Sequence, residues 1–216
     1  QKIIKPWFEI LDIPSEKLVY FDGNLANEFE NLTVICCPFR RIDSIVVSWH
    51  SNSFFRLRER VRKKFKNIIG REKNRLFISR SDATHRRMLN ENQFTEFLKQ
   101  YGFQTLVLSE MEIKEQLELV VNAEWFISVL GAGSSLSAFA PEDATVIEIT
   151  ERKVAGNYNG LPSAVFLDQA FYRVGNTSDQ ATRDTLNNDF YGDLDHFRKV
   201  FKTYQNLREA EIKRKF

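Results

Sequence analysis

Residues 125–135 read WFISVLGAGSS, an apolar run that passes directly into a turn rich in glycine and serine. The apolar run predicts a buried strand over 125–130, and the residues after the turn, up to Phe139, predict a short helix. In an open α/β sheet, ligands bind beyond the carboxyl ends of the strands, which is where such a strand-to-helix turn lies. This unit therefore predicts a fold class and the position of a binding site together.

Apolar runs and helical spacings alternate on both sides of this unit. Further strands are predicted over residues 18–21, 32–37, 42–49, 75–79, 103–108 and 144–150. Helices are predicted over residues 54–69, where Leu57, Val61 and Phe65 share an apolar stripe, and over 90–101, 112–123 and 163–171. Strands that alternate with helices at this spacing favour a parallel sheet with helices on both faces, which is a Rossmann-like α/β domain. We place this domain at 70–192, a long charged helix at 193–216 and a separate part of the chain at 1–69. The long helix carries an apolar stripe that runs from Leu194 through Phe197 and Phe201 to Leu207.

The charge of the chain is small overall but unevenly distributed. The 216 residues carry a net charge of only +2. A protein that binds nucleic acid through its phosphates usually has a stronger basic excess, so no nucleic-acid partner is expected. Residues 56–66 nevertheless hold seven Lys or Arg and a single acid, Glu59. This run has two interpretations: a solvated helix face, or a surface that contacts acidic lipid or an anionic polymer as a peripheral membrane contact.

Several features bear on the compartment of the protein. No apolar run is long enough to span a membrane. The two cysteines, Cys36 and Cys37, are adjacent, and neighbouring residues rarely pair, which favours a reducing, cytoplasmic compartment. Two glycosylation-type triplets, at 31–33 and 176–178, matter only if the chain enters a Golgi or ER lumen. The chain begins at Gln1 without a methionine, from which we expect processing or a fragment.

The turn after residue 130 carries the first candidate binding residues. Gly131, Ala132 and Gly133 would let the backbone approach a ligand closely, and Ser134 and Ser135 add hydroxyl donors. The helix N-terminus that follows suits a diphosphate. The alternative is that small residues only make a tight turn. Because the third glycine of the dinucleotide fingerprint is absent, NAD is not indicated.

Two arginines form the second candidate group. Arg80 follows the predicted strand 75–79, at the carboxyl edge of the sheet, and Arg86 comes soon after it. Guanidinium groups bind phosphate oxygens in a bidentate fork, so the pair would neutralise a nucleotide diphosphate. The alternative is a surface ion-pair cluster with Asp82 and Glu91.

An acid in the last predicted strand of the domain is the third candidate. Glu148 ends an apolar run and would accept hydrogen bonds from ribose hydroxyls, as acids do in nucleotide sites. The alternative is a charge at a strand end that faces solvent. His50, His85 and His196 show no metal-ligand spacing with the cysteines, so no metal site is predicted.

A series of short motifs occurs in a fixed order along the chain. They are Phe77-Ile78-Ser79-Arg80, Ala83, Arg86-Arg87, Asn90-Glu91, Gly102-Phe103, Glu115-Gln116, Ala123, Gly131-Ala132-Gly133 and Val146-Ile147-Glu148. Together they resemble the C-terminal half of glycosyltransferase family 61, which includes bacterial capsular polysaccharide transferases and sugar transferases of the eukaryotic secretory pathway. The resemblance covers residues 70–150 well and residues 1–69 only loosely.

The resemblance implies a fold and a reaction. It implies a GT-B arrangement in which 70–192 binds the nucleotide sugar and 1–69 is the end of an acceptor-side domain that is largely missing. The implied reaction is inverting transfer of a hexose or pentose to a hydroxyl of a glycan or polysaccharide, as in capsule biosynthesis, without a metal or another cofactor. No catalytic residue is assigned, because the general base normally comes from the other side of the cleft.

The same resemblance distributes roles among the candidate residues. Arg80 and Arg86 would contact the diphosphate, the loop 131–135 would cradle it, and Glu148 would lie near the ribose. Asn90 and Gln116, which match the Asn-Glu and Glu-Gln parts of the family pattern, complete the expected nucleotide-sugar site.

One position departs from the family pattern. The histidine that usually precedes Gly-Ala-Gly is Leu130 here, so a hydrogen-bond donor to the diphosphate is missing. Two alternatives to an active enzyme therefore stay open: a non-catalytic module that binds a sugar nucleotide or a glycan, and a plain α/β domain for protein interaction.

Overall fold

The computed structural model describes two compact units of the chain. Residues 1–66 form the first unit and residues 67–216 the second. Within them, the described residues are 4–19, 28, 39–42, 45–49, 51–151, 170–176 and 189–215. The expected short strands at 18–21 and 32–37 lie wholly or partly outside these ranges.

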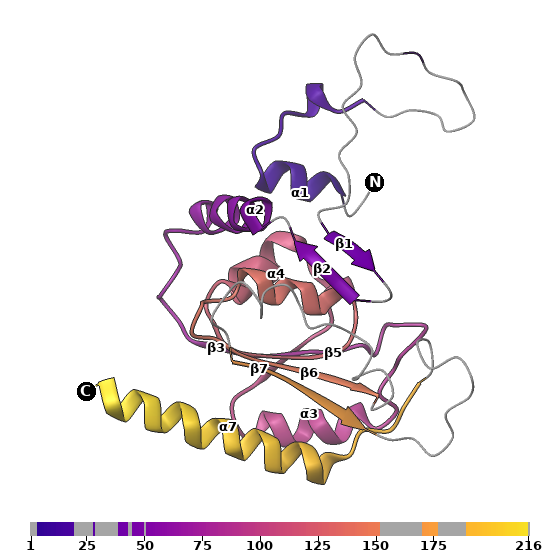
Figure 1. The fold of residues 1–216 in the computed structure, drawn as a ribbon, viewed down its shortest axis with the longest axis vertical. Helices are drawn as coiled ribbons and strands as arrows, with labels where there is room; N and C mark the ends of the chain where they lie inside the picture. The colour runs from indigo at the N-terminus through magenta and orange to yellow at the C-terminus, as the bar shows by residue number, and fades with distance from the viewer. Residues whose placement is uncertain are drawn as a thin grey trace. The chain divides into compact units, whose positions relative to one another are not determined.

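The first unit combines short helices with a two-stranded hairpin (Figure 1). Its elements are α1 (Ile4–Ile10), η1 (Ser15–Lys17), β1 (Phe39–Ile42), β2 (Ile45–Trp49) and α2 (Ser51–Lys64). Strands β1 and β2 pair antiparallel. Helix α2 was predicted to continue to residue 69, but it ends at Lys64. Val61 and Phe65 are buried as its apolar spacing predicted, whereas Leu57 is 38% exposed and Arg58 is buried in its place.

The second unit contains a five-stranded parallel sheet, which confirms the predicted fold class. Its strands are β3 (Asn74–Ile78), β4 (Gln104–Leu106), β5 (Ala123–Val129), β6 (Thr145–Glu151) and β7 (Ala170–Asn176). Strand β7 was not expected, because Ser163–Phe171 was predicted as a helix. Residues 170–171 instead begin a strand paired with β6 along its whole length, and 163–169 lie outside the described residues.

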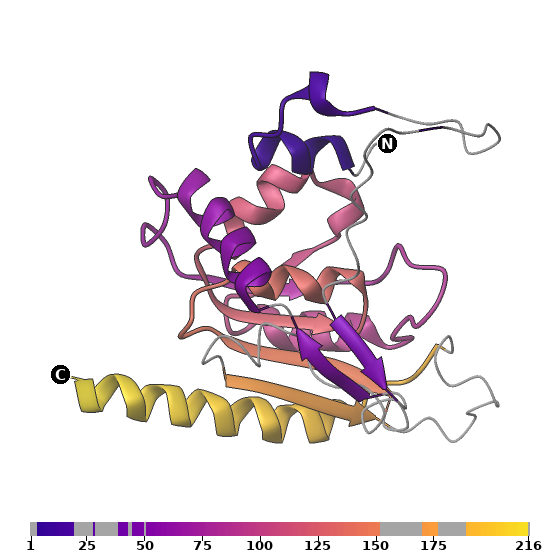
Figure 2. The same cartoon turned by 45° about the horizontal axis from the view of Figure 1, so that its top comes forward.

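Helices cover both faces of this sheet, as Figures 1 and 2 show. Helices α3 (Glu91–Lys99) and α7 (Leu194–Lys215) lie on one face, and α4 (Ile113–Val120) lies on the other. The short 3-10 helix η2 (Leu108–Glu110) follows β4, and η3 (Ala132–Phe139) follows β5 and contacts α4. The predicted short α-helix after the glycine turn is therefore a 3-10 helix.

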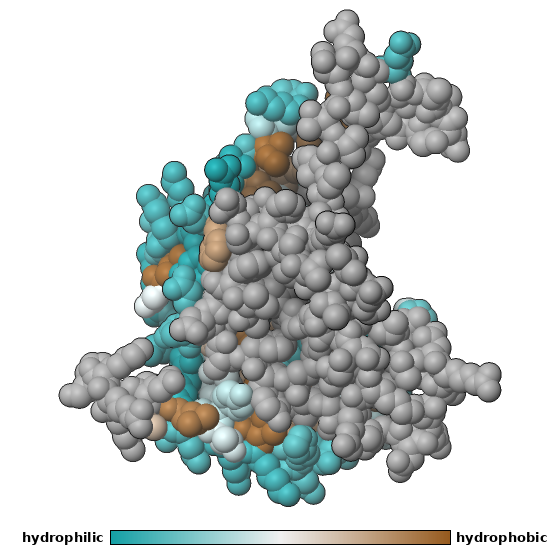
Figure 3. Space-filling view, viewed as in Figure 1, coloured by the Kyte–Doolittle hydropathy of each residue, from teal (hydrophilic) through white to brown (hydrophobic). Residues whose placement is uncertain are grey.

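The core between the sheet and α3 with α7 is built from aromatic side chains. The ring of Phe201 on α7 lies 5.1 Å from that of Trp125 on β5 and 4.8 Å from that of Tyr101, and Phe94 lies 5.1 Å from Phe197. Phe97 and Phe103 add further ring contacts with Phe201. The outer side of α7 is mostly hydrophilic along the lower edge of Figure 3. Leu207, predicted as the last member of the apolar stripe, is 55% exposed.

The strand order places a topological switch point between two particular strands. Along the sheet the order is β4-β3-β5-β6-β7, so the chain leaves β3 toward one side and later returns to its other side through β5. In doubly wound sheets, ligands bind at this topological switch point, outside the carboxyl ends of the two strands. Here those ends continue into Ser79-Arg80 and Leu130-Gly131.

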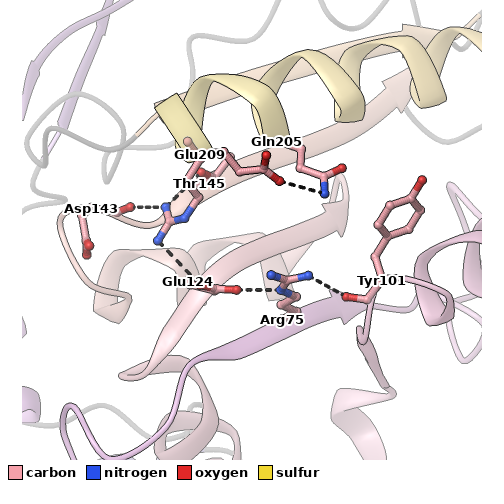
Figure 4. Close-up of polar contacts among 8 residues, drawn as sticks. Arg75, Tyr101, Glu124, Asp143, Thr145, Gln205 and Glu209 are labelled. Carbon is pink, nitrogen blue, oxygen red and sulfur yellow. Dashed lines mark hydrogen bonds and ion pairs between the residues drawn. The ribbon is translucent and has the colours of Figure 1, made fainter. Parts of the chain in front are cut away.

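The opposite, amino edge of the sheet is tied to α7 by charged side chains, shown in Figure 4. Glu124 on β5 accepts a hydrogen bond from Arg75 Nε at 2.6 Å and lies 4.0 Å from Arg208 Nη2. Arg208 also donates to the backbone oxygen of Asp143 at 2.6 Å and to Thr145 Oγ1 at 3.3 Å. This network fixes the C-terminal half of α7 against the strands.

We expect Glu124→Gln to lower the free energy of unfolding by about 1.5–3 kcal/mol, because the largely buried Arg208 and the more exposed Arg75 lose the anion that they share. Urea denaturation measures this. Glu118→Gln is the matched control, because the one ion pair of Glu118 among the described residues is the exposed pair with Lys114 on α4, at 3.9 Å. This substitution should change stability by less than about 0.5 kcal/mol. Equal effects of the two substitutions would contradict the assigned role of Glu124.

Candidate functional site

Arg80 and Gly131 meet at the switch point. Arg80 follows β3 and Gly131 follows β5. A Cβ atom built on Gly131 would lie only 1.7 Å from Nη1 and 2.8 Å from Cζ of Arg80. The guanidinium therefore occupies the space that a side chain at 131 would need. The structure brings these two predicted site residues together at the carboxyl edge of the sheet.

A carboxylate holds the backbone from which Arg80 projects. Glu91, in the first turn of α3, accepts hydrogen bonds from the Ser79 hydroxyl and, at 3.0 Å, from the backbone N–H of Arg80. The N–H of Ser81 in turn donates to Ser79 Oγ at 3.1 Å. The sequence suggested Glu91 as an ion-pair partner in a surface cluster; the structure shows it as the anchor of the strand-end turn. The place of Glu91 in the Asn-Glu motif was the feature of the sequence that could have indicated this role.

Arg80 and Arg86 form a cationic pair beside this turn. Arg80 Nη2 donates to the backbone oxygen of His85 at 2.9 Å. Among the described residues, the Nε atoms of Arg80 and Arg86 are buried without a hydrogen-bond acceptor. Burial lowers the pKa of the Arg80 guanidinium and the neighbouring Arg86 charge lowers it further, while Asp82 and Glu91 act in the opposite direction. Two cations held close together with unused donors would be stabilised by an anion.

The backbone at Arg86 is unusual. Its φ angle of 58° lies in the left-handed region, which non-glycine residues seldom adopt. Such conformations are unfavourable by about 1–3 kcal/mol and are concentrated at functional sites. The sequence offered no signal for this conformation, since most left-handed positions outside glycine are Asn or Asp.

The serines of the glycine turn bond within the turn itself. Ser134 is fully buried, and its Oγ accepts a hydrogen bond from the N–H of Gly131 at 3.3 Å and contacts Ser128 Oγ at 3.1 Å. The hydroxyl of Ser135 donates to the backbone oxygen of Ala132 at 2.6 Å. These two hydroxyls, expected to face a ligand, thus stabilise the conformation of the turn in this structure.

Gly133 has a packing role. A Cβ there would lie 2.7 Å from Leu108 Cδ1 and 3.2 Å from Ile78 Cγ2. The absence of a side chain therefore allows η3 to approach the ends of β3 and η2. For Gly133 the tight-turn interpretation suffices, whereas Gly131 makes room for Arg80.

Glu148 lies inside β6 and is fully buried. Both sequence interpretations placed it at a strand end, and the solvent-facing alternative is wrong. Because side chains alternate along a strand and Ile147 and Ile149 belong to the core under α3 and α7, Glu148 points to the opposite face. Its register partner on β5 is Ser128, which contacts the glycine turn through Ser134.

Asn90 and Gln116 use their amide groups to hold backbone. Asn90 Nδ2 donates to the backbone oxygen of Gly192 at 2.8 Å, and the N–H of Gly192 donates back to Oδ1 at 2.7 Å. Gln116 Nε2 donates to the backbone oxygens of Leu108 and Met111 at 2.8 and 3.0 Å. Both residues thereby secure segments that flank the sheet.

Two features that the described residues lack bear on other predictions. No group of three or more His, Cys, Asp or Glu that could hold a metal ion occurs in the part of the chain that the structure describes. Of the helices in that same part, none is both long and apolar enough to cross a membrane. The predicted independence from metals and cofactors stays a prediction.

The parallel sheet, its strand order and the helices on its two faces define an α/β protein of the Rossmann-like class. The sequence model of the family Glycosyltransferase 61 matches residues 7–147, and the chain belongs to this family. The match begins well before residue 70, so it includes the region whose resemblance was only loose. No curated protein matches the chain closely enough to count as a relative.

Membership assigns the chain a general activity. It is a glycosyltransferase, and the family implies a nucleotide-sugar donor and a glycan acceptor. The family resemblance deduced from the ordered motifs is thus confirmed, while the roles of individual residues stay predictions.

Proposed function

We propose that a crevice at the switch point, between the carboxyl ends of β3 and β5, binds the diphosphate of the nucleotide-sugar donor. One observation carries this proposal: Arg80 lies directly over Gly131, beside Arg86, with buried Nε donors that have no acceptor within the described chain. A donor diphosphate supplies the anionic oxygens that two guanidinium forks bind best. The left-handed backbone at Arg86 supports a site whose geometry is set for binding.

In this proposal the reaction is an inverting transfer. A hydroxyl oxygen of a glycan acceptor attacks the anomeric carbon while the bond from that carbon to the diphosphate oxygen breaks, and a general base takes the hydroxyl proton. The leaving diphosphate gains negative charge, and Arg80 and Arg86 stabilise that charge electrostatically. This role requires no metal ion, because the two guanidiniums supply the positive charge. Glu148, buried in β6 opposite Ser128 of β5, is the acid that we expect to accept hydrogen bonds from the ribose hydroxyls.

The wider setting of the reaction follows the family resemblance. We propose a GT-B arrangement, a hexose or pentose as the transferred sugar, and a function in polysaccharide or glycan biosynthesis in the cytoplasm. A second function, a non-catalytic module that binds sugar nucleotides, is favoured by Leu130, which is buried where family members carry a histidine. Turnover of a sugar nucleotide, measured as release of the nucleoside diphosphate with a glycan acceptor present, distinguishes the two functions.

Substitution of Arg80 tests the donor site. Arg80→Ala should weaken binding of uridine or guanosine diphosphate by about 1.5–3 kcal/mol, the scale of charge-assisted hydrogen bonds. Arg80→Lys should also lose affinity, because an ammonium group cannot reproduce the bidentate fork. Isothermal titration calorimetry measures both.

A control for this experiment lies at the other end of β3. Arg71 is exposed and precedes the strand on its amino side, so Arg71→Ala removes the same charge far from the crevice and should leave affinity unchanged. If all three substitutions leave diphosphate affinity unchanged while the wild type binds, Arg80 belongs to the surface and the proposed donor site is wrong.

A further inference from the structure

The solvent-facing side of α2 carries an ordered row of positive charge. Arg58 and Val61 on α2 and Phe65 just after it are buried, so they mark the side of the helix that faces the protein. Arg56 and Arg60 are exposed on the opposite side, and Lys63 continues their row. The spacings i, i+4 and i+7 place these three side chains one above the other on a single helix face.

Other exposed residues extend this row into a broader surface. Lys64 lies beside it and forms an ion pair with Asp12 at 2.6 Å. The hydrogen bond from Lys64 and the Lys64 charge lower the pKa of Asp12, and the charges of Arg60 and Lys63 lower it further. Glu59 is the only acid of α2.

Two large apolar side chains lie beside the row. Phe55 is 40% exposed and Leu57 is 38% exposed, both in the N-terminal half of the helix. Exposed apolar side chains next to a basic row are the combination found in helices that lie in the interfacial plane of a membrane.

We propose that the basic face of α2, formed by Arg56, Arg60, Lys63 and Lys64, docks on an anionic lipid surface. A helix rises about 1.5 Å per residue, so the row from Arg56 to Lys63 spans about 10 Å on a convex face. A small anion would engage only one or two of these cations, whereas a plane of lipid headgroups meets all of them. Phe55 and Leu57 enter the headgroup region beside them. This inference is independent of the proposed donor site.

Vesicle binding tests the proposal with the full chain. The protein should co-sediment with phosphatidylcholine vesicles that contain phosphatidylglycerol and stay in solution with phosphatidylcholine alone. Each basic residue near such a surface contributes about fivefold in affinity, so R56E/R60E/K63E should weaken binding at least about 100-fold. About 1 M NaCl, where the Debye length is about 3 Å, should abolish binding. The double substitution F55S/L57S should also weaken vesicle binding relative to the wild type, compared at the same salt concentration.

A triple variant with the same change of charge is the control. Lys99, Lys199 and Lys202 are exposed on α3 and α7, and K99E/K199E/K202E should retain vesicle binding; circular dichroism checks that both triple variants are folded. Equal loss in the two variants would show a response to net charge alone and would overturn the proposal. Equal binding to neutral and anionic vesicles would also overturn the proposal. The same holds if the protein binds heparin through the α2 face but does not bind anionic vesicles.

Discussion

Phe201→Ala should lower the free energy of unfolding by about 3–5 kcal/mol, the usual range when a buried phenylalanine is truncated in a core. Phe201 is 1% exposed, and its ring contacts those of Phe97, Tyr101, Phe103 and Trp125 at 5.6, 4.8, 5.8 and 5.1 Å between centroids. The substitution leaves a cavity where α7 packs on the sheet and on α3. Urea denaturation, followed by circular dichroism, gives the change in stability.

Leu207 on the same helix provides the comparison. It continues the spacing of the apolar stripe but is 55% exposed, so Leu207→Ala should change stability by less than about 0.5 kcal/mol. A loss at Leu207 as large as that at Phe201 would mean that the stripe packs as the sequence alone predicted. A negligible loss at Phe201 would mean that α7 does not stabilise the sheet.

The contrast between these two residues shows how far the sequence predicts this fold. Apolar spacing predicted α7 and the stripe through Phe197 and Phe201, because a helix that packs on a sheet needs one apolar side. The stripe ends earlier than its sequence pattern: Leu207 is exposed, and Arg208, one residue later, donates hydrogen bonds to Asp143 and Thr145. Such a long-range polar contact leaves no periodic signal.

Strand β7 marks a second limit. The segment around residues 163–171 has helical apolar spacing, yet Ala170–Asn176 pairs with β6. An edge strand of a parallel sheet acquires its hydrogen bonds from a neighbour distant in sequence, and tertiary pairing overrides local propensity. The four other strands were predictable because each is a short apolar run that a helix separates from the next.

The candidate site was predictable in position but only partly in detail. Placing Arg80 and Gly131 on the same edge required only that both follow parallel strands. Which strands would be neighbours depended on the crossover from β4 to β5, and the adjacency of β3 and β5 is what brings the two residues into contact. The hydrogen bond between Ser134 and Ser128 and the burial of Glu148 opposite Ser128 depend on how the elements pack in three dimensions. Sequence position carries no information on that packing.

Gly131→Ala should weaken nucleoside diphosphate binding by about 10–100-fold, close to the effect of Arg80→Ala, because the new methyl group would take the place of the guanidinium. The Cβ position lies 1.7 Å from Arg80 Nη1 and 3.3 Å from Arg80 Cδ, and both atoms belong to a side chain that can move away. The fold should therefore lose less than about 1 kcal/mol. Calorimetric titration with uridine and guanosine diphosphates, together with urea denaturation, measures the two effects separately.

A double-mutant cycle decides whether Gly131 acts through Arg80. Residues in contact give non-additive effects, and here the prediction is complete dependence: once Arg80 is alanine, Gly131→Ala has no guanidinium to displace and should lower affinity no further. The double variant should bind as weakly as Arg80→Ala alone. Two independent losses that add would mean that the backbone at 131 contacts the ligand directly, as a glycine loop that cradles phosphate would do. No loss from Gly131→Ala in the wild-type background would place the diphosphate away from this crevice, even if Arg80→Ala lowers affinity by a long-range charge effect.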